Sequence, residues 1–360
     1  MQENTTQPGD ARETHLVTGG SGFIAQHLVS LLLDQGVVVR ATVRSLDKAK
    51  KVSALKDLQA KHPDGRLQLF EADLLRPGSF AEAMRGCSVV HHVASPFMMA
   101  EKIKDGQREC VEPALEGTKN VLASVNETES VKRVVLTSSV GAVFGDYADV
   151  TDRMGGVLTE EHFNETSTVT HNPYHYSKVL AEKEAWRISK EQARWDLVVI
   201  CPGLVLGPPL SRGSESGSLF LMDELLRGDL FFGVPNLYFC TVDVRDVAAA
   251  HAKAAAAAAS VVAERRYIVA AAEMAAFVDV ARSFRGLGGG SLTIPTHRVP
   301  DALVRVLGPL FGLTQAWLGR NLGVRFEVDN SRSVKELGVE YTPLEETLEE
   351  HYKGWKAMRQ

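Results

Sequence analysis

The sequence has few cysteines, no long apolar run and no excess of charge of one sign. Its 360 residues include 4 widely separated cysteines, so it indicates neither a disulfide framework nor a cysteine-based zinc site. No run approaches the ~18 apolar residues that a membrane-spanning helix needs. Because 40 basic side chains face 45 acidic ones, neither nucleic acid nor an acidic membrane surface is favoured as a partner.

The start of the chain also lacks the apolar core of a secretory signal. We therefore expect a cytoplasmic protein in which residues 1–13 form a disordered leader. With 44% apolar residues over 360 positions, the remainder can bury a large core.

A glycine cluster is the strongest local feature that is present. Residues 16–24 read Leu-Val-Thr-Gly-Gly-Ser-Gly-Phe-Ile, an apolar run that ends in glycines. Gly19 and Gly20 permit a tight turn, and Gly22 lets the backbone approach a ligand where a helix begins. Since glycine also marks ordinary turns, the cluster alone is weak support for a phosphate-binding loop.

The context of this cluster strengthens that interpretation. Apolar residues at helical spacing follow from Ile24 to Leu32, and Gly36 is suited to end a helix there. A second apolar strand is predicted over residues 37–43. The strand, glycine turn, helix and strand together are typical of a dinucleotide-binding unit.

Further short apolar runs alternate with helical patterns along the chain. The predicted strands lie at residues 67–70, 89–93, 134–136, 197–200 and 267–269. This alternation predicts an α/β fold, a doubly wound parallel sheet of the Rossmann type, with ligands bound beyond the carboxyl ends of the strands.

The chain is expected to divide into two parts. Glycine, proline and serine become frequent after residue 201, which indicates a departure from the sheet. We assign residues 14–204 and 236–271 to the dinucleotide-binding core, and residues 205–235 and 272–360 to a smaller C-terminal substrate-binding lobe.

Tyr174 and Lys178 are the first candidates for chemistry. Residues four apart share one face of a helix, so these two side chains should point the same way, whereas Tyr176 should not. A phenol has a pKa of ~10, and a neighbouring ammonium group favours the phenolate and lowers that pKa. A tyrosine and a lysine at this spacing, with no other motif nearby, are usually an ordinary pair on the protein surface.

Hydroxyl groups at the end of a predicted strand add to this pair. Thr137, Ser138 and Ser139 follow the strand at 134–136, at the carboxyl edge where the glycine loop would hold its ligand. A serine at that edge could share a carbonyl oxygen with the phenol of Tyr174.

These motifs together resemble the extended short-chain dehydrogenase/reductase superfamily. The spacing Gly19-x-x-Gly22-x-x-Ala25 is similar to its TGxxGFI signature, with Ala25 where many members have glycine. Within it, the chain resembles the dihydroflavonol reductase, cinnamoyl-CoA reductase and fungal carbonyl reductase group, from about residue 14 onward.

The resemblance implies a role for each candidate. Tyr174 would donate a proton, Lys178 would hold the nicotinamide ribose and lower the tyrosine pKa, and Ser139, rather than Ser138, would orient the substrate carbonyl. The implied activity is reversible reduction of a ketone or aldehyde to an alcohol by NADPH.

The end of the second predicted strand indicates which nicotinamide cofactor is used. NAD-binding proteins usually carry an acidic residue there, whereas Arg44 in this chain suits the 2′-phosphate of NADP. The resemblance adds Lys51 to that phosphate site and Asp73 to the adenine, although Asp73 is equally suited to cap a helix. The full predicted cofactor set is Gly19, Gly22, Phe23, Ile24, Arg44, Lys51, Asp73, Leu74, Val93, Ala94, Ser95, Tyr174, Lys178, Pro202, Gly203 and Val205.

The predicted substrate contacts are Phe97, Phe144 and Tyr174. Phe144 stands where dihydroflavonol reductases carry a polar residue, and residues 172–178 depart from the cinnamoyl-CoA reductase pattern. Neither activity is therefore assumed, and a small apolar or aromatic carbonyl compound is expected. Phenylalanines at such positions are also often core residues.

Two alternatives stay open. One is an NAD-dependent epimerase, dehydratase or hydroxysteroid dehydrogenase on the same core, which Arg44 disfavours. The other is a non-catalytic dinucleotide-sensing regulator, a class that typically lacks the tyrosine. His91 and His92 would point to opposite faces of a strand, so we expect no metal site. Either a monomer or a homodimer is compatible with the sequence.

Overall fold

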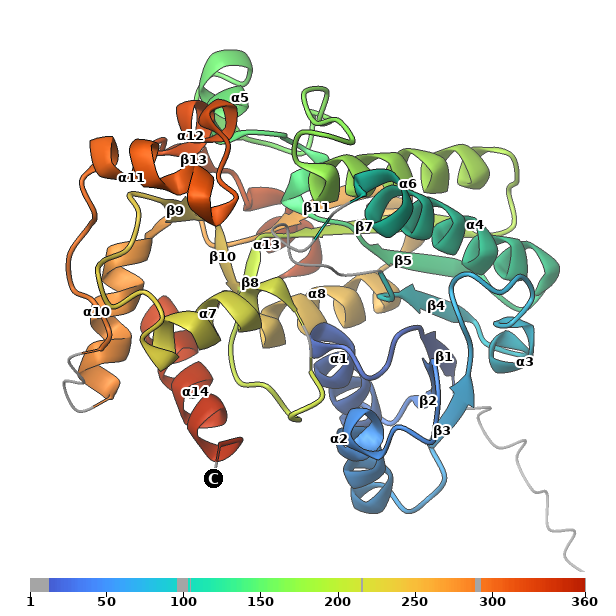
Figure 1. Ribbon diagram of the computed structural model, residues 1–360. Coiled ribbons are helices and arrows are strands. Elements are labelled where there is room, and N and C mark those ends of the chain that lie inside the picture. The colour runs from blue at the N-terminus through green and yellow to red at the C-terminus, as the bar shows by residue number, and fades with distance from the viewer. Residues whose placement is uncertain (1–12, 96–102, 104, 215, 289–292, 360) are drawn as a thin grey trace, which may run out of the picture.

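A seven-stranded sheet forms the centre of the computed structural model, which describes residues 13–95, 103, 105–214, 216–288 and 293–359. The strands are β1 (Thr14–Val17), β2 (Val38–Val43), β3 (Leu67–Glu71), β4 (Val89–His92), β5 (Arg133–Thr137), β7 (Asp196–Pro202) and β11 (Arg265–Val269). Their order is β11-β7-β5-β4-β1-β2-β3, and every neighbouring pair is parallel (Figure 1). The doubly wound parallel sheet predicted from the sequence is confirmed.

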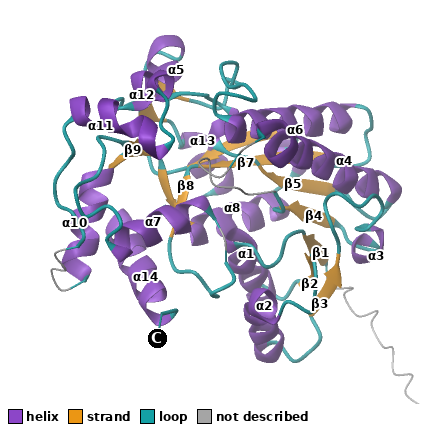
Figure 2. Ribbon diagram, viewed as in Figure 1, coloured by secondary structure: helices purple, strands orange, loops and turns teal. Residues whose placement is uncertain are grey.

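Helices cover both faces of this sheet (Figure 2). One face packs against α1 (Phe23–Asp34), α2 (Ala49–Lys61) and α8 (Val244–Ala256), and the other against α3 (Ala81–Met84), α4 (Glu112–Glu127) and α6 (Pro173–Lys190). Successive strand residues serve opposite faces: Val134 and Leu136 pack in one apolar cluster and Val135 in another. Residues 134–136 of β5 are therefore continuously apolar, as a strand covered on both sides requires.

A smaller lobe lies beside the carboxyl ends of the strands (Figure 1). Three of its helices share one core: α7 (Gly217–Arg227), α10 (Phe277–Leu287) and α14 (Leu344–Ala357). The remaining short elements are η2 (Gln107–Val111), η3 (Val140–Ala142), α5 (Tyr147–Arg153), β6 (Val157–Leu158), β8 (Leu204–Leu206), β9 (Tyr238–Phe239), β10 (Thr241–Asp243), α9 (Ala259–Val262), β12 (Ala275–Ala276), α11 (Asp301–Leu307), η4 (Gly308–Phe311), α12 (Gln315–Asn321), β13 (Glu327–Val328) and α13 (Ser331–Leu337).

Two contacts join the segments that the sequence assigned to the dinucleotide-binding core and to the smaller lobe. β6 lies between β5 and α6 in the chain but pairs with β13 near the C-terminus. α13 falls in the range expected for the smaller lobe, yet Leu337 at its end is buried in the same apolar cluster as Tyr267 of β11. The C-terminal segment therefore contributes to both parts of the molecule.

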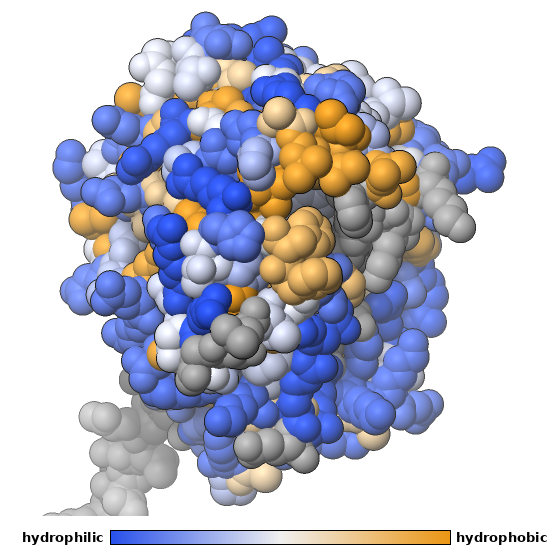
Figure 3. All heavy atoms as spheres, turned by 60° about the vertical axis from the view of Figure 1, so that its left-hand side comes forward, coloured by the Kyte–Doolittle hydropathy of each residue, from blue (hydrophilic) through white to orange (hydrophobic). Residues whose placement is uncertain are grey.

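The outer side of α11 and η4 carries exposed apolar side chains. Leu303, Val306, Leu307 and Leu310 are all exposed, whereas Val304 is buried. Figure 3 shows apolar side chains gathered on this side of the molecule.

None of the helices within the described ranges combines the length and the apolar character required to cross a bilayer. All 4 cysteines are free and buried, in agreement with the absence of a disulfide framework in the sequence pattern.

Candidate active site

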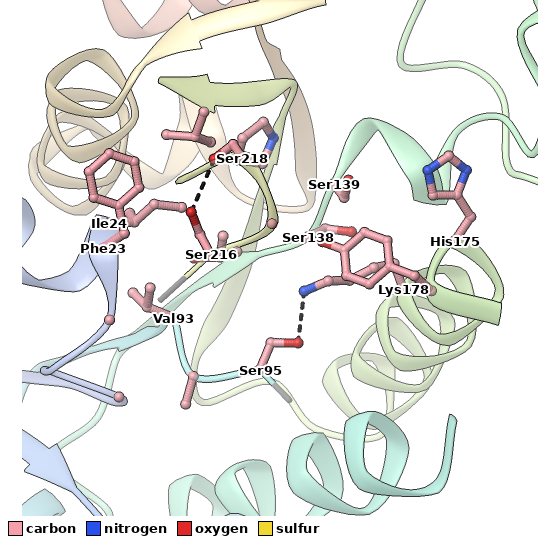
Figure 4. Close-up of a pocket in the computed structure, with 18 of the residues that line it drawn as sticks. Phe23, Ile24, Val93, Ser95, Ser138, Ser139, His175, Lys178, Ser216 and Ser218 are labelled. Atoms are coloured by element: carbon pink, nitrogen blue, oxygen red, sulfur yellow. Dashed lines mark hydrogen bonds between the residues drawn. The ribbon is translucent and has the colours of Figure 1, made fainter. Parts of the chain in front are cut away.

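A cavity of about 770 Å³ lies at the carboxyl ends of the central strands, between the sheet and the smaller lobe. Every predicted site residue that the structure describes lines it: Gly19, Gly22, Phe23, Ile24, Arg44, Lys51, Asp73, Leu74, Val93, Ala94, Ser95, Ser139, Phe144, Tyr174, Lys178, Pro202, Gly203 and Val205. Phe97 lies outside the described residues. The fold thus brings segments from most of the chain to one site (Figure 4).

The glycine loop passes so close to its neighbours that side chains would not fit. Gly19 has φ +68°, and a Cβ atom there would lie 2.9 Å from the Cα atom of Ala94. The amide of Gly20 donates to the carbonyl of Thr42 at 2.7 Å, which holds the loop against β2. Gly22 then precedes α1 without any side-chain cap. A backbone surface at an uncapped helix start suits the pyrophosphate of a dinucleotide.

Basic side chains stand at the end of β2. Arg44 directly follows the strand with its side chain exposed, and Lys51 lies on α2; both line the cavity. Asp73 lines it too, but its Oδ1 also accepts from the amide of Leu75 at 2.8 Å, so part of this carboxylate stabilises its own turn. The residues at this edge fit a cofactor with a phosphate on the adenosine ribose.

The start of α7, within a stretch that the sequence marked only as irregular, also lines the cavity. Ser216, the N-cap residue of α7, and Ser218 have their hydroxyl groups 3.0 Å apart (Figure 4). The loop before α7 is tied to α1, because Gln26 donates to the hydroxyl of Ser211 at 3.0 Å. Only the tertiary structure places these serines beside the glycine loop.

Ser139, Tyr174 and Lys178 meet at the centre of the cavity. The hydroxyl of Ser139 forms a hydrogen bond with the phenol of Tyr174. Lys178 Nζ lies 5.7 Å from the centre of the Tyr174 ring and donates to Ser95 Oγ at 2.9 Å (Figure 4). Ser138 instead donates to the buried carboxylate of Glu182 at 2.5 Å. The two serines therefore have different partners, and Ser139 is the one beside the phenol.

Burial controls the protonation of this group. It raises the pKa of Tyr174 to about 12, and the hydrogen bond from Ser139 only partly opposes that shift. Burial also lowers the pKa of Lys178 to about 8, against the attraction of Cys110, Cys201 and Glu182. The pKa of Tyr174 is thus shifted in the direction opposite to the lowering expected from Lys178, because desolvation of the buried phenol dominates. At neutral pH Tyr174 is a neutral phenol with a proton to give.

Aromatic side chains form the wall opposite the cofactor edge. Phe144 lies in this wall but is only 2% exposed, and its ring centre lies 5.7 Å from those of Tyr147 and His175 and 5.6 Å from that of Phe326. Phe144 is thus a core residue as well as a wall of the cavity. The wall also contains four residues that were not identified from the sequence, namely Tyr147, Phe239, Trp317 and Asn321.

The histidines near the site have structural partners. His175 is half-buried, and its Nδ1 donates to the carbonyl of Gly145 at 3.0 Å. His91 pairs with His15 at 3.1 Å, whereas His92 pairs with Thr18 at 3.1 Å. Across the described part of the chain, no group of three or more metal-ligating side chains occurs.

The chain is similar to members of a known family. Residues 15–270 match the NAD dependent epimerase/dehydratase family. The chain belongs to this family. It is 36% identical over 342 residues to cinnamoyl-CoA reductase CAD2 of Medicago truncatula, covering 94% of each chain. It is also 36% identical over 258 residues to a Vitis vinifera anthocyanidin reductase, covering 68% of this chain and 73% of that one.

The chain is also similar to a solved structure, that of yeast methylglyoxal/isovaleraldehyde reductase Gre2 complexed with NADPH. The two chains are 27% identical with a TM-score of 0.75, over 96% of this chain and 99% of that one. These relatives confirm the resemblance to the reductase group inferred from the sequence motifs.

Proposed function

We propose that this chain reduces the carbonyl group of a small apolar or aromatic ketone or aldehyde with a hydride from NADPH. The chain is an oxidoreductase, as are its relatives in the family. The observation that carries the proposal is the meeting of Ser139, Tyr174 and Lys178 in the cavity that also contains the glycine loop and Arg44.

NADPH supplies the hydride, and the chain supplies its binding site. The glycine loop would hold the pyrophosphate, with Arg44 and Lys51 on the 2′-phosphate and Asp73 beside the adenine. Ser95 and Lys178 would hold the nicotinamide ribose, and residues 202–205 would lie against the nicotinamide. The family is described as NAD dependent, but an arginine at the end of β2 favours NADP over NAD.

The residues of the chain would divide the remaining chemistry between them. The hydroxyl of Ser139 orients the substrate oxygen, and the neutral phenol of Tyr174 gives it a proton as negative charge develops there. Lys178 is buried beside the phenol, where it favours the phenolate that remains after proton transfer. The buried site keeps water from competing for these hydrogen bonds.

The walls of the cavity support the substrate class. Phe144, Tyr147, Phe239 and Trp317 present mainly carbon, so an aromatic or aliphatic group would be retained there by burial of apolar surface. The resemblance gives dihydroflavonol reductases a polar residue where this chain has Phe144, so their substrate is not carried over to this chain.

A panel of aromatic and aliphatic ketones and aldehydes tests this proposal, with NADPH consumption as the readout. Tyr174→Phe should lower kcat by about 10²- to 10⁴-fold, the usual contribution of general acid catalysis. Tyr176→Phe is the matched control, because Tyr176 does not line the cavity. Turnover that is unchanged in Tyr174→Phe would overturn the mechanism.

The same experiment separates the alternatives. A clear preference for NADH over NADPH would favour an NAD-dependent epimerase, dehydratase or hydroxysteroid dehydrogenase. Tight binding of NADPH without turnover of any compound in the panel would favour a dinucleotide-sensing regulator.

A further inference from the structure

The helix that carries Tyr174 begins in an unusual backbone conformation. Asn172, its N-cap residue, adopts φ 54° and ψ 55°, in the left-handed region, which is uncommon for residues other than glycine, although asparagine adopts it more readily than most. Its side chain does not cap the helix. Instead, Asn172 Nδ2 donates to the carbonyl of Gly145 at 2.8 Å and to Asp146 Oδ1 at 2.9 Å. The conformation that sets the direction of Tyr174 is therefore held from outside the helix.

Asp146 is the centre of this arrangement. Its side chain is 1% exposed and receives hydrogen bonds or ionic contacts from four donor groups. Oδ1 accepts from Asn172 and from Asn321 Nδ2 at 2.7 Å. Oδ2 lies 2.8 Å from His171 Nε2 and 3.3 Å from Arg320 Nε. Because all four partners are donors, only a carboxylate satisfies all of them.

Asp146 and its four partners come from three separate segments of the chain. Asp146 itself ends the loop that begins at Ser139, and His171 and Asn172 directly precede Tyr174. Asn321 and Arg320 belong to α12. Asn321 also accepts from the amide of Tyr147 at 2.9 Å and donates to the carbonyl of Trp317 at 2.9 Å. One buried carboxylate thus connects the serine, the tyrosine and the α12 wall.

We propose that Asp146 is a positioning residue, which aligns Tyr174 with Ser139 and sets both against the wall formed by α12. The proposal rests on the proposed function for its kinetic readout only. Asp146 lines neither the cofactor edge nor the cavity, so its loss should affect the alignment of the substrate with the phenol and leave the cofactor edge intact. A catalytic group displaced by a fraction of an ångström loses much of its effect on the rate.

The substitution Asp146→Asn tests this idea because it conserves volume. The new amide places an NH₂ group against donors, so at least one contact of the set is lost. Asp246→Asn is the matched control: Asp246 is also buried, accepts from the amide and hydroxyl of Thr342 at 2.8 Å each, and lies outside the cavity.

We expect Asp146→Asn to lower kcat by about 10- to 100-fold while the Kd for NADPH changes less than about twofold. Asp246→Asn should lower Tm without this loss of kcat, when both are assayed below their unfolding range. Equal kcat values for the two variants, or a parallel loss of NADPH affinity in Asp146→Asn, would overturn the inference.

Hydrogen–deuterium exchange keeps the inference testable even if no carbonyl compound is turned over. Amides at the start of α6, including that of Tyr176, which donates to the carbonyl of Asn172 at 3.0 Å, should exchange faster in Asp146→Asn than in the wild type or in Asp246→Asn. If these amides exchange at the wild-type rate in Asp146→Asn, the positioning role is refuted. If they exchange faster as expected but the wild type reduces no carbonyl compound, only the proposed function is refuted.

Discussion

The two halves of the cavity are built in different ways. The half assigned to the cofactor consists of short turns at strand ends, such as Gly20 bonded to Thr42 of the next strand. The half assigned to the substrate depends on contacts between distant segments, such as Asp146 with Asn321, 175 positions apart. The first half is therefore encoded in short motifs, and the second exists only after the chain has folded.

The glycine loop allows the strongest test of the cofactor half. In Gly19→Ala, the new Cβ would lie 2.9 Å from the Cα atom of Ala94, so the loop must move. We expect NADPH affinity, measured by fluorescence titration, to fall by about 100-fold or more, which corresponds to about 2.7 kcal/mol. Gly78→Ala is the control, since Gly78 has a similar φ of +73° and nothing within 4 Å. Equal behaviour of the two variants would contradict the close-approach argument.

Phe144 tests whether the substrate half is also part of the core. Phe144→Ala removes a ring that is 2% exposed, so it should lower the free energy of unfolding by about 3–5 kcal/mol in chemical denaturation. Activity should shift toward bulkier carbonyl compounds because the wall recedes. Phe231→Ala, at a side chain that is 67% exposed, should change neither property. A stable Phe144→Ala variant would mean that the wall is not part of the core.

Acid should lower the free energy of unfolding through two buried histidines of the sheet and its covering helix. Burial lowers the pKa of His92 and of His251 to about 3. Since the unfolded state then binds more protons, stability is full above about pH 6.5 and is lost as the pH falls toward 3. Each histidine should lower the free energy of unfolding by about 2 kcal/mol between about pH 6.5 and about pH 5.

Denaturation curves across this pH range measure the effect. His251→Gln should have a shallower loss of stability with acid than the wild type, whereas substitution of the exposed His297 by Gln should leave the slope unchanged. A His251→Gln variant with the wild-type slope would show that this histidine is not responsible.

Arg44 gives the smallest expected effect, because its side chain is exposed and its interactions are screened by solvent. Arg44→Ala should reduce the preference for NADPH over NADH, taken from the kcat/KM ratio, by about tenfold, or about 1.4 kcal/mol. Lys48→Ala is the control, since Lys48 is exposed nearby but does not line the cavity. A ratio that stays constant in Arg44→Ala would remove the argument for NADP specificity.

Local patterns were sufficient for much of the fold and for the cofactor edge. Each predicted strand has a counterpart within about two residues. The predicted helix after the glycine loop ends at Asp34, with Gln35 as its C-cap residue and Gly36 following at φ +86°. The spacing of Tyr174 and Lys178 was readable for the same reason, since helical periodicity alone puts them on one face.

The same patterns could not identify Tyr147, Trp317 and Asn321 in the cavity. Trp317 and Asn321 are remote from the catalytic motifs in the chain. Tyr147 lies only a few residues after Ser139, but nothing in its local sequence distinguishes it from a core residue. His175 shows the same limitation, because its burial depends on the turn at Gly145.

The sequence by itself determined the parallel sheet, the glycine loop and the order in which Ser139, Tyr174 and Lys178 occur, because these depend on periodicity and backbone freedom over a few residues. The tertiary structure decided which serine faces the phenol, how strongly burial shifts the pKa of Tyr174 and Lys178, and which distant residues form the substrate wall. Desolvation and side-chain contacts depend on the whole fold, so no short stretch of sequence contains them.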